Sequence, residues 1–267
     1  MEKISVIMGV YNCSVTLPKA IESILNQTYP NIELIICDDC SSDDTFSVAK
    51  RYQAQNPDRI CLIKNEKNLS LGPTLNRCLQ YATGEYIARM DGDDYSAPDR
   101  LSKQLAFLKE NPQYDLVGTN MMAFNNGGEL GLRTIKSGEA TKFDTVFGVP
   151  FCHATILAKR SVYDDLQGYS CNQNTWRVED VDLWFRFFLA GKRGYNMNEA
   201  LYYVREDGSE YRRRTFRNYR NATYVCLNGT RSLKLPLRYY IGSLFPIAKC
   251  LVPMWLIKLY RKNINSK

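Results

Sequence analysis

Acidic side chains gather at two points in the N-terminal part of the sequence, each directly after a strand-like apolar run. Asp38 and Asp39 follow IELIIC, and Asp91 and Asp93 follow YIARM. The carboxyl ends of parallel strands meet at one edge of a sheet, where ligands collect. Carboxylates there repel one another unless a cation or hydrogen-bond donors compensate, and oxygen ligands suit Mg²⁺ or Mn²⁺. The pattern favours a divalent metal site that binds phosphate oxygens, although each cluster alone is equally typical of a turn or helix cap.

A third acidic pair, Glu179 and Asp180, stands at the start of an apolar helical pattern (VDLWFRFFL). The helix dipole stabilises a charged carboxylate at a helix N-terminus. With an ordinary pKa of about 3.9, an aspartate is ionised at neutral pH. We therefore expect Asp180 to stay ionised at this helix start. Taken alone, the pair is better explained as ordinary helix-terminal acidic residues.

The segments that must position these residues alternate between strand and helix patterns. Strands are predicted over residues 4–10, 32–37, 60–63 and 86–90. Helices are predicted over residues 16–25 with Thr16 as N-cap, after a cap at Ser42 or Asp43, and over residues 73–81 and 98–109. Short connections between alternating strands and helices imply parallel strands with helices on both faces. The predicted fold class is α/β, a three-layer sandwich with a mostly parallel central sheet.

The second half of the chain has a looser pattern. Strands are predicted over residues 116–124 and 153–157, with a turn at residues 125–128 leading into a further short strand. A helix is predicted over residues 179–190, with Gly191 as its stop. Because no internal repeat or change of composition interrupts residues 1–210, we expect them to form one domain.

Charge is distributed unevenly along the 267 residues. Residues 1–210 contain 22 basic and 28 acidic residues, whereas residues 211–267 contain 13 basic and no acidic ones. Within this basic, helical C-terminal extension, residues 239–257 carry one charge and are interrupted by two prolines. A membrane span needs about 20 apolar residues, so the segment is a marginal candidate for crossing a bilayer. Attachment to the surface of an anionic membrane fits better; the alternative is that its apolar side packs on the body.

Composition narrows the class of protein. An apolar share of 45% and a charged share of 24% are ordinary for a globular protein, which excludes a disordered chain, a collagen-like repeat and a disulfide miniprotein. The net charge of +7 comes from the extension, so no nucleic-acid partner is expected. Nine scattered cysteines, an odd number, fit free thiols in a reducing compartment. The sequence starts directly with a strand pattern instead of a secretory signal, so we expect cytoplasmic residence.

Four segments carry a resemblance to a known family: SVIMGVYN, QTYPNIELIICDDCSSDDT, ATGEYIARMDGDD and VEDVDLWFR. The chain resembles the inverting glycosyltransferases of family 2, which have the Rossmann-like GT-A fold, and in particular those of bacterial surface-polysaccharide synthesis. The resemblance covers about residues 3–205, and its motifs occur in the same order and at matching spacing. It implies a GT-A domain at residues 1–210, followed by the extension at residues 211–267.

The resemblance also implies which residues bind the donor. Asp39 would contact the uracil edge, with Asp38 as its structural neighbour and Tyr11 near the base. Asn76 lies in a segment where family members also hold the sugar nucleotide. Two other positions of this segment lack the glycine and arginine of many members, so Asn76 is its transferable residue.

Asp91 and Asp93 match the Asp-x-Asp motif of the family. By resemblance, Asp91 lies toward the ribose, phosphate and metal, and Asp93 ligates the metal, Mn²⁺ or Mg²⁺. Glu179 and Asp180 match a Glu-Asp pair of which the second residue is the general base. Such a base would lie opposite the leaving diphosphate, so that a single displacement inverts the configuration of the sugar.

Two aromatic residues are candidates for contacts outside the nucleotide. His153 is the only histidine, which excludes a histidine-rich metal cluster or a Ser-His-Asp triad. By resemblance it could face the diphosphate or the acceptor, and a buried core histidine is an equal alternative. Trp176, just before the Glu-Asp pair, could stack on a sugar ring or fill the core.

The expected function is transfer of a hexose or N-acetylhexosamine from a UDP-sugar to a hydroxyl of a glycan, such as a lipid-linked oligosaccharide. The product would belong to a capsule, an exopolysaccharide or an O-antigen. The chain lacks the Gln-x-x-Arg-Trp motif of processive relatives, so a single addition is expected, by an enzyme held at the inner face of the cell membrane. Alternatives are a sugar nucleotidyltransferase, which would need a glycine-rich phosphate loop after the first strand, and a non-catalytic nucleotide-binding module.

Overall fold

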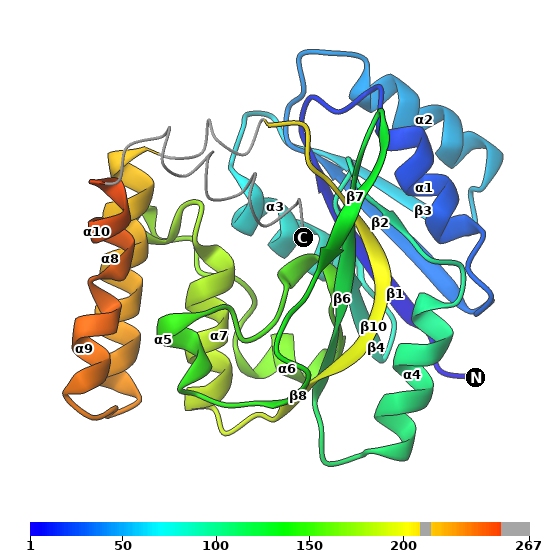
Figure 1. Cartoon of the computed structure of the whole chain (residues 1–267). Helices are drawn as coiled ribbons and strands as arrows, with labels where there is room; N and C mark the ends of the chain where they lie inside the picture. The colour runs from blue at the N-terminus through cyan, green and yellow to red at the C-terminus, as the bar shows by residue number, and fades with distance from the viewer. Residues whose placement is uncertain (209–214, 252–267) are drawn as a thin grey trace.

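The computed structural model describes residues 1–208 and 215–251 (Figure 1). In this part of the chain ten strands form one sheet, in the order β3-β2-β1-β4-β9-β6-β10-β5, with β7 beside β6 and β8 beside β10. The strands are β1 (Ile4–Val10), β2 (Ile32–Asp38), β3 (Ile60–Lys64), β4 (Tyr86–Arg89), β5 (Tyr95–Ser96), β6 (Leu116–Asn125), β7 (Gly128–Arg133), β8 (Gly138–Ala140), β9 (Leu157–Lys159) and β10 (Gly194–Arg205).

The sheet is mixed, with a parallel central part. β1 pairs in parallel with β2 and β4, β2 with β3, and β6 with β10. β9 lies antiparallel between β4 and β6, and the short strands β5, β7 and β8 also pair antiparallel with their neighbours. The predicted α/β class with a mostly parallel central sheet is therefore confirmed.

The strand predicted over residues 153–157 is wrong in its position. Residues His153–Thr155 form a 3₁₀ turn, η1, and the strand β9 begins only at Leu157. Thr155 closes the turn, because both its backbone N–H and its hydroxyl donate to the carbonyl oxygen of Cys152. A short apolar run with a threonine does not distinguish this turn from a strand.

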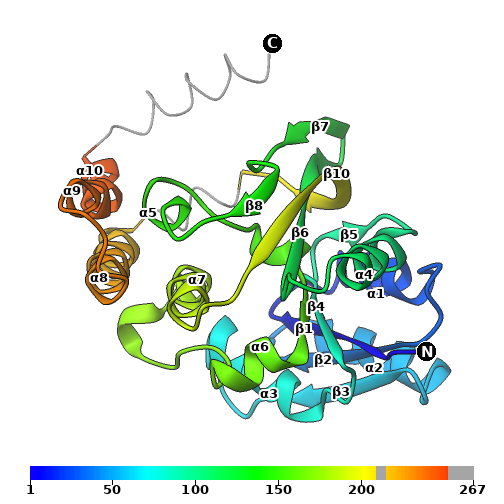
Figure 2. The same cartoon turned by 90° about the horizontal axis from the view of Figure 1, so that it is seen from below.

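Helices cover both faces of the sheet, as a three-layer sandwich requires (Figures 1 and 2). One core contains apolar residues of α1 (Leu17–Leu25), α2 (Thr45–Gln55) and α4 (Arg100–Glu110). The other core contains residues of α3 (Leu71–Tyr81), α6 (Arg160–Asp165) and α7 (Glu179–Leu189). The predicted stop of α7 is confirmed, because Gly191 has a φ of 70°, which glycine adopts without strain.

Two predicted helix caps differ in detail. Thr16 occupies the N-cap position of α1, but its hydroxyl does not cap the helix. It donates instead to the carbonyl oxygen of Gly92, 3.0 Å away. α2 begins at Thr45, later than expected, and the carboxylate of Asp43 accepts a hydrogen bond from the backbone N–H of Thr45 and one from that of Ser14. Both side chains join loops instead of closing helices.

The C-terminal extension contains three described helices, α8 (Phe216–Ser232), α9 (Arg238–Ser243) and α10 (Phe245–Cys250), and α9 and α10 pack back against α8. Val225 and Cys226 of α8 share a buried apolar cluster with Val178 and Phe185 at α7. Part of the extension therefore packs on the body, which was the alternative reading of its apolar residues. Among the described residues, no helix is both long and apolar enough to cross a membrane. The end of the predicted membrane-seeking segment, residues 252–257, lies outside them.

Candidate active site

The strands β1, β2 and β4, each followed by polar or acidic residues, end at one edge of the sheet. β1 lies between β2 and β4, with Val10 opposite Asp38 and Ile7 opposite Arg89. The backbone N–H of Asp39 donates to the carbonyl oxygen of Val10 over 2.8 Å. The strand order turns outward on both sides of β1, which is the topological switch point where open α/β sheets bind ligands. The parallel arrangement thus brings the predicted donor residues together.

The turn after β4 fits tightly against the end of β1. A Cβ atom on Gly92 would lie 2.9 Å from side-chain atoms of both Val10 and Cys13, so a larger residue would displace the turn. Thr16 binds the carbonyl oxygen of the same glycine. Gly92 therefore allows Asp91 and Asp93 to project from a turn that is fixed against the first strand and helix.

A buried arginine binds Asp91. Arg89, whose side chain is 5% exposed, contacts both carboxylate oxygens of Asp91 through two of its nitrogens. The hydroxyl of Tyr202 in β10 accepts a hydrogen bond from the backbone N–H of Asp91 over 3.1 Å. Sequence reasoning missed Arg89, although an arginine inside the apolar run YIARM was a signal, because a buried charge needs a partner.

Asp94 belongs to the acidic cluster after the fourth strand but was not among the predicted site residues. It is buried, and its carboxylate accepts hydrogen bonds from the hydroxyl of Tyr202, 2.9 Å away, and from the backbone N–H of Arg205, 2.7 Å away. Burial raises the pKa of Asp94 well above its usual value, and the negative charges of Asp91 and Asp93 raise it further. Burial and the neighbouring carboxylates thus both disfavour ionisation of Asp94.

Asp91, Asp93 and Asp94 each offer a carboxylate oxygen, and these three oxygens lie within 4.8 Å of one another. Such a set of hard oxygen ligands fits Mg²⁺ or Mn²⁺. Arg89 binds both oxygens of Asp91, and Tyr202 and the backbone bind Asp94. Asp93 thus belongs to the carboxylate group that could hold a metal, and its role as a metal ligand stays a prediction.

Asp38 and Asp39 are both buried. Asp39 accepts hydrogen bonds from the side-chain amide of Asn65 at 2.7 Å and from the backbone N–H groups of residues 69 and 70 at 2.7 and 2.9 Å. Asp38 accepts one from the backbone N–H of Ser41. The pair thus fixes the loops beside the switch point, while Tyr11 is exposed at the same edge. The contacts predicted between these residues and a nucleotide stay predictions.

The predicted base lies in the first turn of α7. Asp180 accepts a hydrogen bond from the backbone N–H of Val181 at 2.8 Å. Burial nevertheless raises the pKa of Asp180, opposed by this hydrogen bond and by the positive charge of Arg89. The helix terminus thus does not decide the direction of the shift, contrary to our expectation. The charge of Asp91 also acts on Asp180, so the structure brings the metal-side and base-side carboxylates near each other.

Glu179, the neighbour of Asp180, is buried. Burial and the negative charge of Asp180 raise the pKa of Glu179 to about 7. Glu179 therefore keeps its proton to a higher pH than an ordinary glutamate does. A carboxyl group with a strongly raised pKa next to a second carboxylate is typical of functional sites.

His153 and Trp176 lie on the base side. His153 is buried, and its Nε2 lies 2.7 Å from the hydroxyl of Tyr169. Burial lowers the pKa of His153 well below its usual value, with help from the charge of Arg89, so the ring is neutral. Trp176 is partly exposed, and the guanidinium of Arg217 in α8 lies 4.7 Å from its ring centroid. Ligand contacts of both residues stay predictions.

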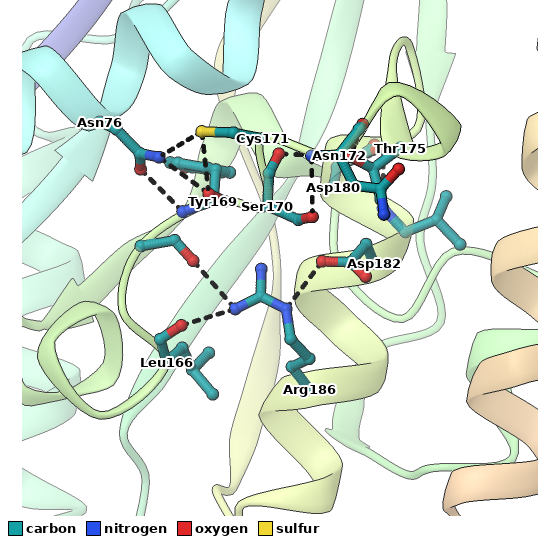
Figure 3. Close-up of polar contacts among 12 residues, drawn as sticks. Asn76, Leu166, Tyr169, Ser170, Cys171, Asn172, Thr175, Asp180, Asp182 and Arg186 are labelled. Carbon is teal, nitrogen blue, oxygen red and sulfur yellow. Dashed lines mark hydrogen bonds and ion pairs between the residues drawn. The ribbon is translucent and has the colours of Figure 1, made fainter.

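Asn76 binds protein atoms in this structure. Its side-chain amide donates to the carbonyl oxygen of Tyr169 at 2.8 Å and accepts from the N–H of the same residue at 2.7 Å (Figure 3). From α7, Arg186 donates to the carbonyl oxygens of Leu166 and Gly168, 2.7 and 2.9 Å away. Both residues hold the loop that leads into α7, and no local pattern in the sequence indicated it.

Comparison with known proteins gives a consistent result. The sequence model of "Glycosyl transferase family 2" matches residues 5–167. A putative glycosyltransferase of Bacillus subtilis, EpsE, is 48% identical, with 99% of this chain and 96% of the relative aligned. The O-antigen biosynthesis glycosyltransferase WbnJ of Escherichia coli is 30% identical, with 94% of this chain and 98% of the relative aligned.

Two solved structures share the fold. Staphylococcus aureus TarS in complex with UDP-GlcNAc superposes with a TM-score of 0.69 at 20% identity, covering 94% of this chain and 82% of that one. The mannosyltransferase PcManGT of Pyrobaculum calidifontis, in complex with GDP-Man and Mn²⁺, gives a TM-score of 0.69 at 16% identity, covering 98% and 79%. The arrangement of strands and helices is thus that of GT-A glycosyltransferases.

Proposed function

The chain belongs to glycosyl transferase family 2, and we propose that it transfers one sugar from a UDP-sugar to a hydroxyl group of a glycan, with inversion and with the help of a divalent metal. One observation carries this proposal. The acidic turn after β4 and the base candidate at the start of α7 come from distant parts of the chain, yet they lie close enough in the fold that the charges of Arg89 and Asp91 both affect the pKa of Asp180. A donor site and a proton acceptor side by side are what a single displacement needs.

The nucleotide would bind at the ends of β1 and β2. Tyr11 is exposed there, and the buried Asp38 and Asp39 fix the neighbouring loops. Asn76 would act on the donor through the loop that it holds. That the donor carries UDP is supported by the motif resemblance, and TarS, which shares the fold, was solved with UDP-GlcNAc.

Asp93, supported by Asp91 and Asp94, would hold Mn²⁺ or Mg²⁺. When bound, such an ion neutralises negative charge on a diphosphate leaving group. The protein itself contributes a second cation, because Arg89 compensates Asp91 in the buried floor of the site. PcManGT, of the same fold, was solved with Mn²⁺, which supports a divalent metal as cofactor.

Asp180 would accept the proton of the acceptor hydroxyl. The raised pKa of Asp180 brings it closer to the value at which a carboxylate is an effective base at neutral pH. Glu179, whose pKa is about 7, would also bind and release protons beside Asp180. The partly exposed ring of Trp176 and the neutral His153 would border the acceptor and the sugar.

The acceptor would be a growing bacterial polysaccharide, such as a lipid-linked oligosaccharide. WbnJ, similar over almost the whole chain, is described as an enzyme of O-antigen biosynthesis, which supports this class of product. We further propose that the enzyme works in the cytoplasm at the inner membrane surface. Leu237, Ile241 and Leu251 are 82%, 72% and 85% exposed on an acid-free extension, which supports contact with anionic lipid.

A ligand panel and one substitution test the function. We expect UDP-sugars to raise the melting temperature of the purified protein, more so with Mn²⁺, because only a ligand of the folded state stabilises it. Asp180→Asn should keep this stabilisation and lose transfer by about 100-fold or more. Full transfer by the Asp180→Asn variant would refute the assigned base. A protein that no nucleotide sugar stabilises would refute the donor site.

A further inference from the structure

The loop that leads into the predicted base is strained at its last turn. Residues 166–178 connect α6 to α7, and Arg177, two residues before Glu179, has a φ of 65°. A residue other than glycine keeps a left-handed backbone conformation only where the surrounding structure holds it there. The direction in which the chain enters α7 therefore depends on what fixes this turn.

Three side chains from three different helices hold the loop. Asn76 of α3 binds the backbone of Tyr169, and Arg186 of α7 binds two carbonyl groups at the loop start (Figure 3). The third is Asn221 of α8. Its side-chain amide donates to the carbonyl oxygens of Gln173, 3.3 Å away, and of Trp176, 3.2 Å away. Of these three side chains, only that of Asn221 binds the residue next to the strained turn.

Asn221 is fully buried although it is polar. Its side-chain oxygen accepts a hydrogen bond from Arg220, so both ends of the amide are used. The two carbonyl groups that it satisfies belong to the first residue of the 3₁₀ turn η2 (Gln173–Thr175) and to the residue that follows this turn. One helical turn earlier, Arg217 lies over the ring of Trp176. α8 therefore contacts both the backbone and the side chain of the residue that precedes the strained turn.

The position of α8 is itself fixed by close packing on α7. A Cβ atom on Gly229 would lie 2.2 Å from the ring of Phe185, so only glycine allows this approach. Val178, between the strained residue and Glu179, is buried in the same cluster as Val225 and Cys226. α8 thus packs on α7 in a fixed position (Figure 2). Its residue Asn221 is thereby held against the loop.

We propose that α8 of the C-terminal extension is part of the catalytic architecture, and that Asn221 is a positioning residue for the acceptor side of the site. Its two donated hydrogen bonds fix Trp176 and the turn that aims Asp180. The inference rests on the proposed function, because it assigns Asn221 to the loop that carries the proposed base. It predicts an effect on sugar transfer that spares binding of the nucleotide at the ends of β1 and β2.

The test compares Asn221→Asp with Asn228→Asp. The first change keeps the size of the side chain and removes both donated hydrogen bonds. The second makes the same chemical change at an exposed position of the same helix. We expect Asn221→Asp to lower the turnover number for transfer about tenfold or more, since misplacement of about 1 Å costs up to about 100-fold. Stabilisation by UDP with Mn²⁺ should stay within about twofold in affinity, and Asn228→Asp should match the wild type.

A second readout does not depend on activity. Amide hydrogen exchange of Thr175 and Val178, which close the turn by hydrogen bonds, should accelerate about tenfold in Asn221→Asp and remain unchanged in Asn228→Asp. Asn221→Ser, which keeps one donor in a smaller side chain, should be intermediate in both measurements and serves if the first variant does not fold. Wild-type exchange and turnover in Asn221→Asp would overturn the inference. The outcome would instead count against the proposed function if the wild-type protein transfers no sugar while hydrogen exchange is accelerated in Asn221→Asp as expected.

Discussion

The guanidinium group of Arg89 and the carboxylate of Asp91 form a two-point ion pair at the end of β4, with the arginine buried and the aspartate partly exposed. The two residues are separated by one position in the sequence, and β4 ends at Arg89, so the pair joins the last strand residue to the acidic turn that follows. Arg89 is the cation whose charge acts on Asp91, His153, Glu179 and Asp180. It therefore connects the metal side and the base side of the site.

Arg89→Met should destabilise the protein, because it leaves Asp91 beside two other carboxylates without its cation. Removing one partner of a buried pair costs about 3–5 kcal/mol, and the partial exposure of Asp91 places the expected loss near about 3 kcal/mol. Mn²⁺ should restore more stability to the variant than it gives the wild type. Urea unfolding with and without Mn²⁺ measures both effects, and Arg51→Met, at an exposed position, is the control. An unchanged free energy of unfolding would show that the pair contributes nothing.

Asp93→Asn should remove the metal-dependent part of nucleotide binding. With UDP at about 100 times its dissociation constant, the wild type gains about 2.7 kcal/mol of stability; a 100-fold weaker affinity would leave about 0.4 kcal/mol. The measurement is the shift in melting temperature with UDP, with and without Mn²⁺. Asp58→Asn, an exposed aspartate away from the strand ends, should behave like the wild type. Equal metal enhancement in both variants would contradict the ligand role of Asp93.

The raised pKa of Glu179 predicts a pH-dependent cost. Its pKa is about 7 in the folded protein and about 4.5 as its ordinary value, so the folded state binds more protons between these values. The contribution of Glu179 to the free energy of unfolding must therefore fall as the pH rises from about 4.5 to 7. Glu179→Gln removes this titration, so its stability relative to the wild type should rise between pH 5 and 8. Thermal unfolding of both proteins at several pH values measures this difference in stability. For the exposed control Glu110→Gln the difference should not depend on pH, and the same result for Glu179→Gln would contradict the prediction.

The sequence was sufficient to predict which acidic residues meet at the sheet edge. Alternating apolar strands and amphipathic helices fix the parallel order, and that order places Asp38, Asp39, Asp91 and Asp93 at the ends of the two strands on either side of β1. This inference needs only local periodicity and the short connections between elements. The same reasoning failed at His153, where a short apolar run formed a 3₁₀ turn before its strand.

The contacts that hold the site together could not be predicted in this way. Asn76 meets Tyr169, and Asn221 meets Trp176, across large distances in the sequence. A polar residue on a helix gives the same local signal whether it faces solvent or a distant carbonyl group. Only the packing of the helices decides between the two, so these positioning residues required the structure.

The exposed apolar side chains of α9 and α10 predict binding to anionic membranes. These helices pack against α8, and α9 also contacts the short helix α5 (Asp144–Phe147) (Figures 1 and 2). Leu237→Glu combined with Ile241→Glu should weaken sedimentation with phosphatidylglycerol vesicles at least about tenfold, because each buried apolar side chain contributes about 1.5–3 kcal/mol. Leu132→Glu, an exposed apolar residue of β7, is the matched control and should bind like the wild type.

The basic residues of the extension predict that its membrane binding depends on anionic lipid. Each Lys or Arg near an anionic surface adds about 1 kcal/mol, and salt screens this attraction within about 10 Å at 0.1 M. Lys234 and Lys249 are exposed beside the apolar side chains of α9 and α10. Replacing both lysines with glutamine should therefore reduce binding to phosphatidylglycerol vesicles about tenfold or more, while phosphatidylcholine vesicles bind the wild type and the variant equally weakly. Equal binding of the wild type to both lipids would show that the extension recognises no anionic surface.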